Sequence, residues 1–238
     1  MRVAIVSEYA RPWPGGISEH VHHESHELAK LGHEVLVVTG PGDAAGSVPT
    51  LRLARALELT GNGARSRLSF GVLLVRLRRA LTTFRADVVH VHAPLDPLLA
   101  LVAVLAATAP VVGTFHASFE ASLAWDALYR TPPARAAFGR LARRIAVSRE
   151  AERSIARYFP AAYARVPNGV DVARFGVRAA RAGDSTLLFV GRPDPRKGLP
   201  DALAAFARVR AARPGARLLL AGVDARALGR AAHGVTQE

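Results

Sequence analysis

The sequence predicts an α/β protein whose strands form parallel sheets. Three features of its 238 residues lead to this expectation: short apolar runs alternate with segments of helical periodicity, glycine-bearing turns follow several of these runs, and the alternation restarts late in the chain after an aperiodic stretch. Continuous apolar strands separated by amphipathic helices are typical of parallel sheets that are covered on both faces.

The first expected unit begins with Val3–Ser7, an apolar run of strand length that leads into the glycine-bearing loop Arg11–Gly16. A helix that ends at Gly32 follows the loop, and four residues recur on its predicted buried face: Ile17, Val21, Leu28 and Leu31. The same reasoning predicts strands at Glu34–Thr39, Asp87–Val91, Val111–Phe115, Ile145–Ser148 and Ala164–Val166, and helices at Phe70–Phe84 and Leu98–Ala107.

A stretch with two glycines and little periodicity, residues 171–184, predicts a linker. The strand–turn–helix alternation returns after it, with expected strands at Leu187–Val190 and Arg217–Ala221. We therefore expect a complete Rossmann-like domain over residues 1–170 and the start of a second one over 185–238. Because two or three strands are few for such a domain, the chain is expected to be C-terminally truncated.

The composition narrows the classes of partner. The formal net charge is +13, carried almost entirely by arginine. Such a charge suits anionic lipid or phosphorylated ligands, but an Ala/Arg-rich coding bias would produce it too, and both explanations stay open. Nucleic acid is not expected, because neither a recognition-helix signature nor interleaved aromatic and basic residues are present.

Two absences exclude further classes. The chain has no cysteine, which excludes disulfides, thiolate metal sites and cysteine nucleophiles. Its longest apolar stretch, Leu98–Ala109, is too short to span a bilayer, so a cytoplasmic location is expected.

Ligands of a parallel sheet bind beyond the carboxyl ends of its strands, and the first candidate residues lie there. Gly15 and Gly16 directly precede a helix, where bare backbone and helix N–H groups can bind a diphosphate; an ordinary tight turn is the alternative. His116 follows a strand and can hydrogen-bond to a sugar, although a lone histidine is often structural. No Gly-x-Gly-x-x-Gly pattern is present, so a nicotinamide dinucleotide is not expected.

A second glycine-bearing turn, residues 191–198, again lies between a strand and a helix. Arg192 and Lys197 in this turn can neutralise a diphosphate whose charge grows as a sugar leaves it; a solvated basic loop is the alternative. Asn168 lies in an Asn-Gly turn that closes the first domain, where a ligand contact is secondary.

Other polar side chains are expected to be structural. His90 and His92 share one face of their strand and are expected to pack in the core. Three helical histidines face away from the apolar stripe at a spacing that does not match zinc proteases, so they predict a solvated face and no metal site: His22, His23 and His26.

The helix expected at Phe70–Phe84 carries Arg76, Arg78 and Arg79 away from its apolar side. This pattern is typical of an ordinary surface helix. The alternative is a docking face for anionic lipid headgroups.

Six segments in order resemble the retaining glycosyltransferases of sequence family 4, which have the GT-B fold. They cover nearly the whole chain: Pro14–Gly16, Val88–His92, Gly113–His116, Ile145–Ser148, Val166–Asp171, and Phe189–Arg192 with Arg196–Gly198. Within the family, four segments are similar to the actinobacterial phosphatidylinositol mannosyltransferases: Met1–Tyr9, Pro14–Gly16, Thr114–Ser118 and Arg144–Ser148. Those enzymes transfer mannose from GDP-mannose to phosphatidylinositol at the inner face of the membrane.

The resemblance implies a role for each matched residue. His116 would bind the transferred sugar and, with the two cations of the second turn, form the catalytic set. The remaining roles are donor binding by Gly15, Gly16, Arg192, Lys197 and Asn168, binding of the inositol phosphate headgroup by Tyr9 and Arg67, and membrane docking by Arg76, Arg78 and Arg79.

The chain also departs from the family in two ways. Ser18 and Leu95 stand where the subfamily carries amide side chains facing the acceptor, and the family's Glu-x7-Glu segment would lie beyond Glu238. The expected activity is hexosyl transfer with retention, at the membrane surface and without a metal or cofactor. Two alternatives remain: a nucleotide- or lipid-binding remnant without turnover, and a family-4 transferase with another donor and a soluble acceptor.

Overall fold

The computed structural model divides the chain into two compact units, the first comprising residues 1–58 and 67–169 and the second residues 59–66 and 170–238. The structure describes residues 1–13, 15–41, 47–53, 55–61, 64–70, 74–119, 123–173, 175–176, 185–191, 197–223 and 235–237.

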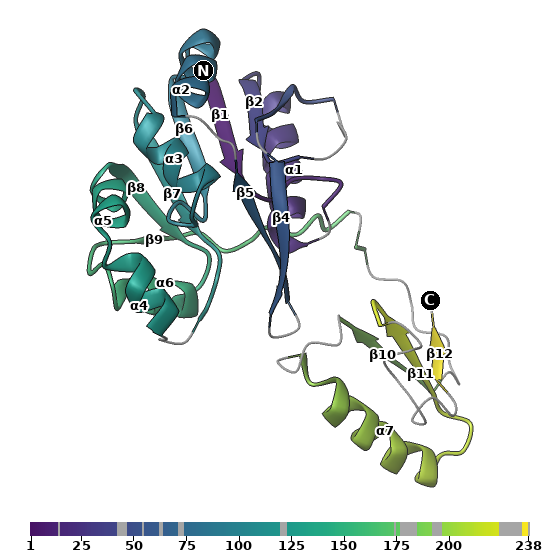
Figure 1. Cartoon of the computed structure of the whole chain (residues 1–238). Helices are drawn as coiled ribbons and strands as arrows, with labels where there is room; N and C mark the ends of the chain where they lie inside the picture. Colours follow the sequence, from purple (N-terminus) through teal and green to yellow (C-terminus); the bar gives the residue numbers. More distant parts are fainter. Residues whose placement is uncertain are drawn as a thin grey trace. The chain divides into compact units, whose positions relative to one another are not determined.

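The first unit is built on a parallel sheet of seven strands in the order β3-β2-β1-β6-β7-β8-β9 (Figure 1). The strand order therefore reverses at β1: β2 and β3 follow on one side of it, and β6 to β9 follow on the other. The strands are β1 (Arg2–Ser7), β2 (Glu34–Thr39), β3 (Thr50–Arg52), β6 (Val88–His92), β7 (Val111–Phe115), β8 (Leu141–Ala146) and β9 (Ala164–Arg165).

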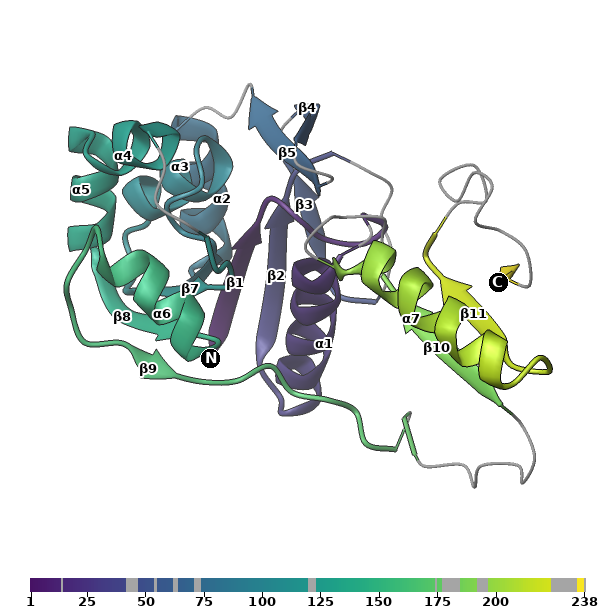
Figure 2. The ribbon, with the colours of Figure 1, turned by 90° about the horizontal axis from the view of Figure 1, so that it is seen from below.

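Helices cover both faces of this sheet. Alternate residues of β1 point to opposite faces, and the apolar residues on each face pack against helices. Val3 and Ile5 pack with Val21 of α1, whereas Ala4 and Val6 belong to a larger core with the helices on the other face. Figure 2 shows α1 on one side of the strands and α2 and α3 on the other. The helices are α1 (Gly16–Lys30), α2 (Leu74–Phe84), α3 (Leu99–Ala106), α4 (Leu123–Tyr129), α5 (Pro132–Gly139) and α6 (Arg149–Ala156).

Two further strands, β4 (Arg55–Gly61) and β5 (Ala64–Phe70), pair with each other in a separate two-stranded sheet. The sequence patterns did not predict this pair. They also placed the following helix too early, since Phe70 ends β5 and α2 begins at Leu74.

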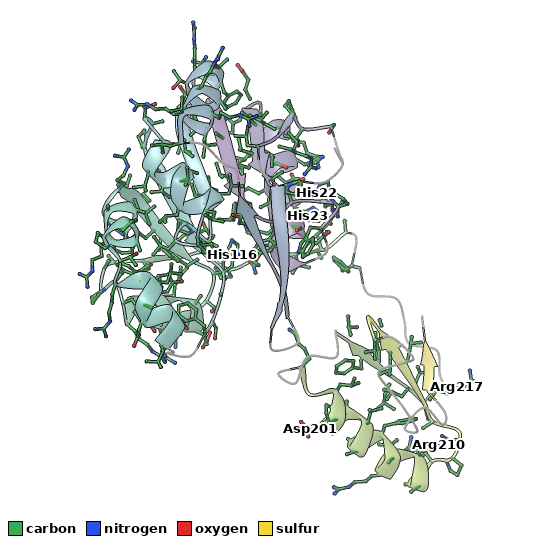
Figure 3. The ribbon with its side chains drawn as sticks, in the orientation of Figure 1. His22, His23, His116, Asp201, Arg210 and Arg217 are labelled. Carbon is green, nitrogen blue, oxygen red and sulfur yellow. The ribbon has the colours of Figure 1, made fainter. Side chains whose placement is uncertain are left out.

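The second unit contains a parallel sheet in the order β10-β11-β12, with α7 packed against it through Leu199 and Phe206. Asp201 lies in the first turn of α7 and Arg210 in its last turn, where their charges complement the helix dipole (Figure 3). The elements are β10 (Thr186–Val190), α7 (Leu199–Ala212), β11 (Arg217–Ala221) and β12 (Val235–Gln237).

The α/β class with parallel sheets is confirmed, and so are most of the expected strands, but β8 begins four residues earlier than its prediction at Ile145. The part of β8 before Ile145 includes Arg143 and Arg144, and these charged residues interrupt the apolar run. The guanidinium of Arg144 lies 4.6 Å from the centre of the Phe138 ring, and this cation–π contact accommodates its charge on the strand. Leu31, expected on the buried face of α1, is 74% exposed at the end of that helix.

Candidate functional site

The strand order places a candidate binding region at the carboxyl ends of β1, β6 and β7. β1 lies between β2 and β6, and the chain continues from β2 outward in one direction and from β6 outward in the other. The strand order therefore reverses at this edge of the sheet. In open parallel sheets, ligands bind where the strand order reverses. The loop from β1 to α1, the end of β6 and the residue after β7 all reach this edge.

The start of α1 is open backbone. Gly15 precedes the helix with φ 155°, Gly16 is its first residue, and both are exposed. A Cβ built on either glycine would meet nothing within 4 Å, and no side chain caps the helix. A helix of 15 residues therefore presents uncapped N–H groups and its positive end to solvent, an arrangement that suits an anion.

Tyr9 lies in the same loop, directly beyond β1. Its backbone N–H donates to Oγ of Ser7 at 3.0 Å, its carbonyl accepts from the same hydroxyl at 2.8 Å, and its ring lies 6.4 Å from that of Trp13. Arg67, the other residue expected to bind the acceptor, lies on β5, and its side chain falls outside the described part of the chain.

His116 directly follows β7 (Figure 3). It makes a short contact with the end of the neighbouring strand β6. Its Nε2 lies 2.8 Å from Nδ1 of His92, and the two rings stack with centroids 5.1 Å apart. His92 is almost completely buried at the end of β6. The histidine that the sequence singled out thus belongs to a cluster.

Glu24 of α1 connects this cluster to a negative charge. Its Oε1 lies 2.5 Å from Nδ1 of His90, and its Oε2 lies 2.9 Å from Nε2 of His92. The other nitrogen of His90, Nε2, lies 2.7 Å from Oγ1 of Thr114. One carboxylate therefore faces both histidines of β6. His92 is buried in the core as expected, but the expectation did not include a charged partner for either histidine.

Burial and charge oppose each other in the protonation of these groups. Burial would raise the pKa of Glu24, but the contacts from His90 and His92 outweigh it and lower the pKa well below its usual range. Burial lowers the pKa of His92 to about 4. Burial, together with the neighbouring His92, lowers the pKa of His116 to about 3. At neutral pH the cluster therefore holds an ionised carboxylate and neutral imidazoles at His92 and His116.

His20 completes the cluster. The ring of His20 lies 5.3 Å from that of His92 and 5.1 Å from that of His116. Burial lowers the pKa of His20, and the neighbouring side chains of Glu24 and Asn168 act in the opposite direction. We call His20, Glu24, His90, His92 and His116 the histidine cluster.

Three members of the histidine cluster have the geometry of a possible cation site. One ligand atom each from His20, Glu24 and His92 lie within 4.8 Å of one another, and no other such group occurs among the described residues. The sequence patterns had suggested a metal site only for His22, His23 and His26, where a solvated face was predicted instead. Of these, His23 is exposed as expected, but Nδ1 of His26 lies 2.7 Å from the carbonyl oxygen of His22.

Sequence reasoning missed Glu24 and His20. A signal was present, because residues four apart on a helix share a face, as do alternate residues of a strand. The pairs His20/Glu24 and His90/His92 both have that spacing.

In the second unit, Lys197 is exposed and lies two residues before α7, next to the N-cap residue Gly198. Gly222 has φ 86°, and a Cβ there would lie 3.0 Å from the carbonyl oxygen of Gly191, so the loops after β10 and β11 pass close together. Arg192 lies outside the described residues.

On α2, Leu77 and Leu81 are buried while Arg76, Arg78 and Arg79 are exposed on the same helix. Among the described helices, none has both the length and the apolar composition needed to span a bilayer. The two positions expected to face an acceptor, Ser18 and Leu95, are both fully buried.

The family model for glycosyltransferase family 4 matches residues 14–174, the greater part of the chain. The chain belongs to glycosyltransferase family 4. Among curated relatives, it is 34% identical over 230 residues to phosphatidyl-myo-inositol mannosyltransferase of Mycolicibacterium smegmatis, covering 93% of this chain and 59% of the relative. It is also 33% identical over 258 residues to glycogen synthase of Mycobacterium tuberculosis, covering 93% of this chain and 61% of the relative.

Solved structures agree with the fold of family 4. Anabaena Alr3699/HepE in complex with UDP and glucose superposes with a TM-score of 0.67 at 15% identity, over 100% of this chain and 68% of that chain. WaaG, a glycosyltransferase of lipopolysaccharide biosynthesis, has a TM-score of 0.60 at 17% identity, over 99% of this chain and 69% of that one. This family-4 chain spans about three-fifths of the length of its curated relatives.

Proposed function

We propose that this protein is a nucleotide-sugar-dependent hexosyltransferase that transfers mannose from GDP-mannose, with retention, to a phosphatidylinositol-type lipid. The observation that carries the proposal is the similarity over 93% of the chain to phosphatidyl-myo-inositol mannosyltransferases, together with the open glycine backbone that begins α1 at the ligand-binding edge of the sheet.

The donor diphosphate would be bound by backbone N–H groups at Gly15 and Gly16 and by the cations Arg192 and Lys197, with Asn168 close to the sugar side. Helix N-termini and cationic side chains stabilise the negative charge that develops on a departing diphosphate. With these groups present, we expect no requirement for a metal ion or cofactor.

His116 would hydrogen-bond to the transferred sugar. As the bond between the anomeric carbon and the diphosphate oxygen breaks, the acceptor hydroxyl oxygen would form its bond on the same face of the sugar. The proton of that hydroxyl would pass to the departing diphosphate, which preserves the anomeric configuration. The neutral state of His116 suits hydrogen bonding rather than proton donation.

Tyr9 and Arg67 would bind the headgroup of the lipid acceptor. The exposed arginines of α2 would dock the protein on the membrane surface. A basic helix face attracts anionic headgroups by about 1 kcal/mol for each charge near the surface. The protein would then act on the cytoplasmic face of the plasma membrane as a peripheral protein.

A second candidate has an observation in its favour. The similarity to glycogen synthase is nearly as high, which supports a family-4 transferase with a different donor and a soluble glucan acceptor. A third reading is that the 238-residue chain binds nucleotide or lipid without turnover.

One assay separates these functions. The 238-residue chain is incubated with radiolabelled GDP-mannose, UDP-glucose or ADP-glucose, each with phosphatidylinositol vesicles or with glycogen, and nucleotide binding is measured in parallel. Label from GDP-mannose in the lipid fraction supports the proposal. Glucose transfer to glycogen supports the second candidate, and GDP binding without transfer in any combination supports the third.

A further inference from the structure

Glu24 lies on α1 and His116 follows β7, so the two residues are far apart in the sequence. Within the histidine cluster, the imidazole of His92 lies between them and contacts both. Glu24 faces His92, and His92 faces His116, at separations of 2.9 and 2.8 Å. We infer that Glu24 is a positioning residue for His116: its carboxylate fixes the proton of His92, and His92 then fixes the proton of His116 on Nε2.

The first step concerns the carboxylate. An ionised carboxylate can only accept hydrogen bonds, so each imidazole nitrogen that faces it must carry hydrogen. Nδ1 of His90 faces Oε1 and Nε2 of His92 faces Oε2. Nε2 of His92 and Oε2 of Glu24 lie 2.9 Å apart, and both atoms are buried without a hydrogen-bond partner among the described residues. The proton of His92 is therefore assigned to Nε2.

The second step concerns the opposite side of the His92 ring. A neutral imidazole protonated on Nε2 has a lone pair on Nδ1, and that atom lies 2.8 Å from Nε2 of His116. Two lone pairs cannot face each other at this distance, so Nε2 of His116 must donate. A second proton on His92 would reverse the pattern, but its ring is buried with those of His20, His90 and His116 at 4.4–5.3 Å, a crowded site for another cation.

The third step gives the consequence. With its proton on Nε2, His116 is left with Nδ1 as a hydrogen-bond acceptor, and Nδ1 has no partner in the described part of the chain. An acceptor at this edge suits a donating hydroxyl of a sugar. This consequence for transfer rests on the proposed function, whereas the position of the proton does not.

A cation bound by His20, Glu24 and His92 is the rival explanation of the same geometry, because their ligand atoms lie within 4.8 Å of one another. A metal ion would displace the proton on Nε2 of His92. The experiment must therefore distinguish a proton from a metal.

The test uses the whole 238-residue chain labelled with ¹⁵N-histidine, freed of metal by chelation and studied at pH 7 by long-range ¹H–¹⁵N NMR. The His116 signals are assigned from the variant His116→Asn. We expect the proton of His116 on Nε2 in the unmodified chain. We expect a mixture of tautomers in Glu24→Gln, because an amide offers only one acceptor oxygen to two imidazoles.

The matched control is Glu27→Gln, an identical change on the exposed side of the same helix, where the carboxylate pairs with Lys30 at 2.7 Å. It should leave the His116 signals unchanged. A His116 proton on Nδ1, a charged His116, or the same His116 tautomer in Glu24→Gln would each overturn the inference. So would saturable shifts of His20 and His92 on adding one equivalent of Zn²⁺, if Glu24→Gln abolished them.

A kinetic readout connects the relay to catalysis. In whichever transfer reaction the chain performs, Glu24→Gln should lower kcat by about tenfold to a hundredfold, the loss seen when the partner that orients a metal-binding histidine is removed. KM for the nucleotide sugar should change little, and Glu24→Asp, which keeps the charge, should restore part of kcat. An unchanged kcat would contradict the relay. If no transfer occurs at all, the proposed function fails while the NMR result still decides the tautomer.

Discussion

Nδ1 of His92 lies 2.8 Å from Nε2 of His116, so the imidazole that ends β6 and the imidazole that follows β7 share one hydrogen bond. The parallel pairing of the two strands aligns them, because His92 is in register with Thr114. Register thus brings together two side chains that are 24 residues apart, and Glu24 of α1 approaches the pair from the helix that covers this face.

The first prediction concerns stability in acid. Because the pKa values of His92 and His116 are lowered in the folded state, the unfolded chain binds more protons as pH falls from about 6.5 toward 4, and unfolding becomes easier. Each histidine adds up to about 1.4 kcal/mol per pH unit to this slope. Asp96 acts in the opposite direction. Burial raises its pKa to about 7, so between pH 7 and 4 the folded chain binds a proton at Asp96 that the unfolded chain does not, which stabilises the fold.

Urea unfolding at several pH values between 7 and 4.5, followed by circular dichroism, measures this slope. His116→Asn should show a shallower fall in unfolding free energy than the parent chain, since it removes one of the histidines whose pKa is lowered in the fold. Equal slopes in the two proteins would show that His116 titrates normally in the fold.

The second prediction concerns packing beneath the cluster. Gly113 is buried on β7, and a Cβ there would lie 2.9 Å from Cγ of Pro94 and 3.0 Å from Cδ1 of Leu141. Gly113→Ala should therefore destabilise the first unit by about 1–3 kcal/mol, the usual cost of overpacking. Gly139→Ala is the matched control, because a Cβ at Gly139 meets nothing within 4 Å. Thermal unfolding of both variants checks this, and equal melting temperatures would contradict it.

The third prediction separates binding from folding at the start of α1. Gly16→Ala should leave the melting temperature unchanged, because a Cβ at Gly16 meets no other atom within 4 Å. The same methyl group would stand where a diphosphate approaches the backbone, so affinity for GDP should fall by at least about tenfold, or 1.4 kcal/mol. Calorimetric titration with GDP measures this, and Gly139→Ala again serves as control. An unaltered Kd for GDP in Gly16→Ala would remove this helix from the proposed donor site.

The fourth prediction concerns the basic face of α2. Changing Arg76, Arg78 and Arg79 together to glutamine should weaken binding to phosphatidylinositol-containing vesicles by about 3 kcal/mol, which is more than a hundredfold. The control removes the same charge from Arg149 and Arg153 of α6 and from Arg157, which directly follows that helix; all three are also exposed. Vesicle sedimentation at low ionic strength gives the comparison. If the two triple variants lose equal affinity, net charge rather than the α2 face determines binding.

Much of the sheet could be predicted, because a strand buried on both faces is a continuous apolar run. The bounds of Glu34–Thr39, Val111–Phe115 and Arg217–Ala221 agree with the strands observed. β8 agrees less well, since Arg143 and Arg144 interrupt its apolar pattern. The paired strands β4 and β5 were not predicted at all.

The candidate site was less accessible to sequence reasoning. Gly15, Gly16 and His116 could be chosen from their positions after apolar runs, which are local features. Glu24 could not be chosen in this way, because its contact with His90 joins residues 66 positions apart and depends on which helix covers the histidine face of β6. A carboxylate on a helix is ordinarily solvated, and only the packing of α1 on the sheet makes this one different.

The edge strand of the second unit has a practical consequence. Leu188 and Val190 of β10 are 61% and 71% exposed, and β10 is the outer strand of its sheet. An apolar edge with open backbone groups can pair with another chain. Preparations of the 238-residue chain should therefore be handled dilute and checked for self-association by light scattering, because intermolecular strand pairing at this edge would distort calorimetric and vesicle-binding titrations.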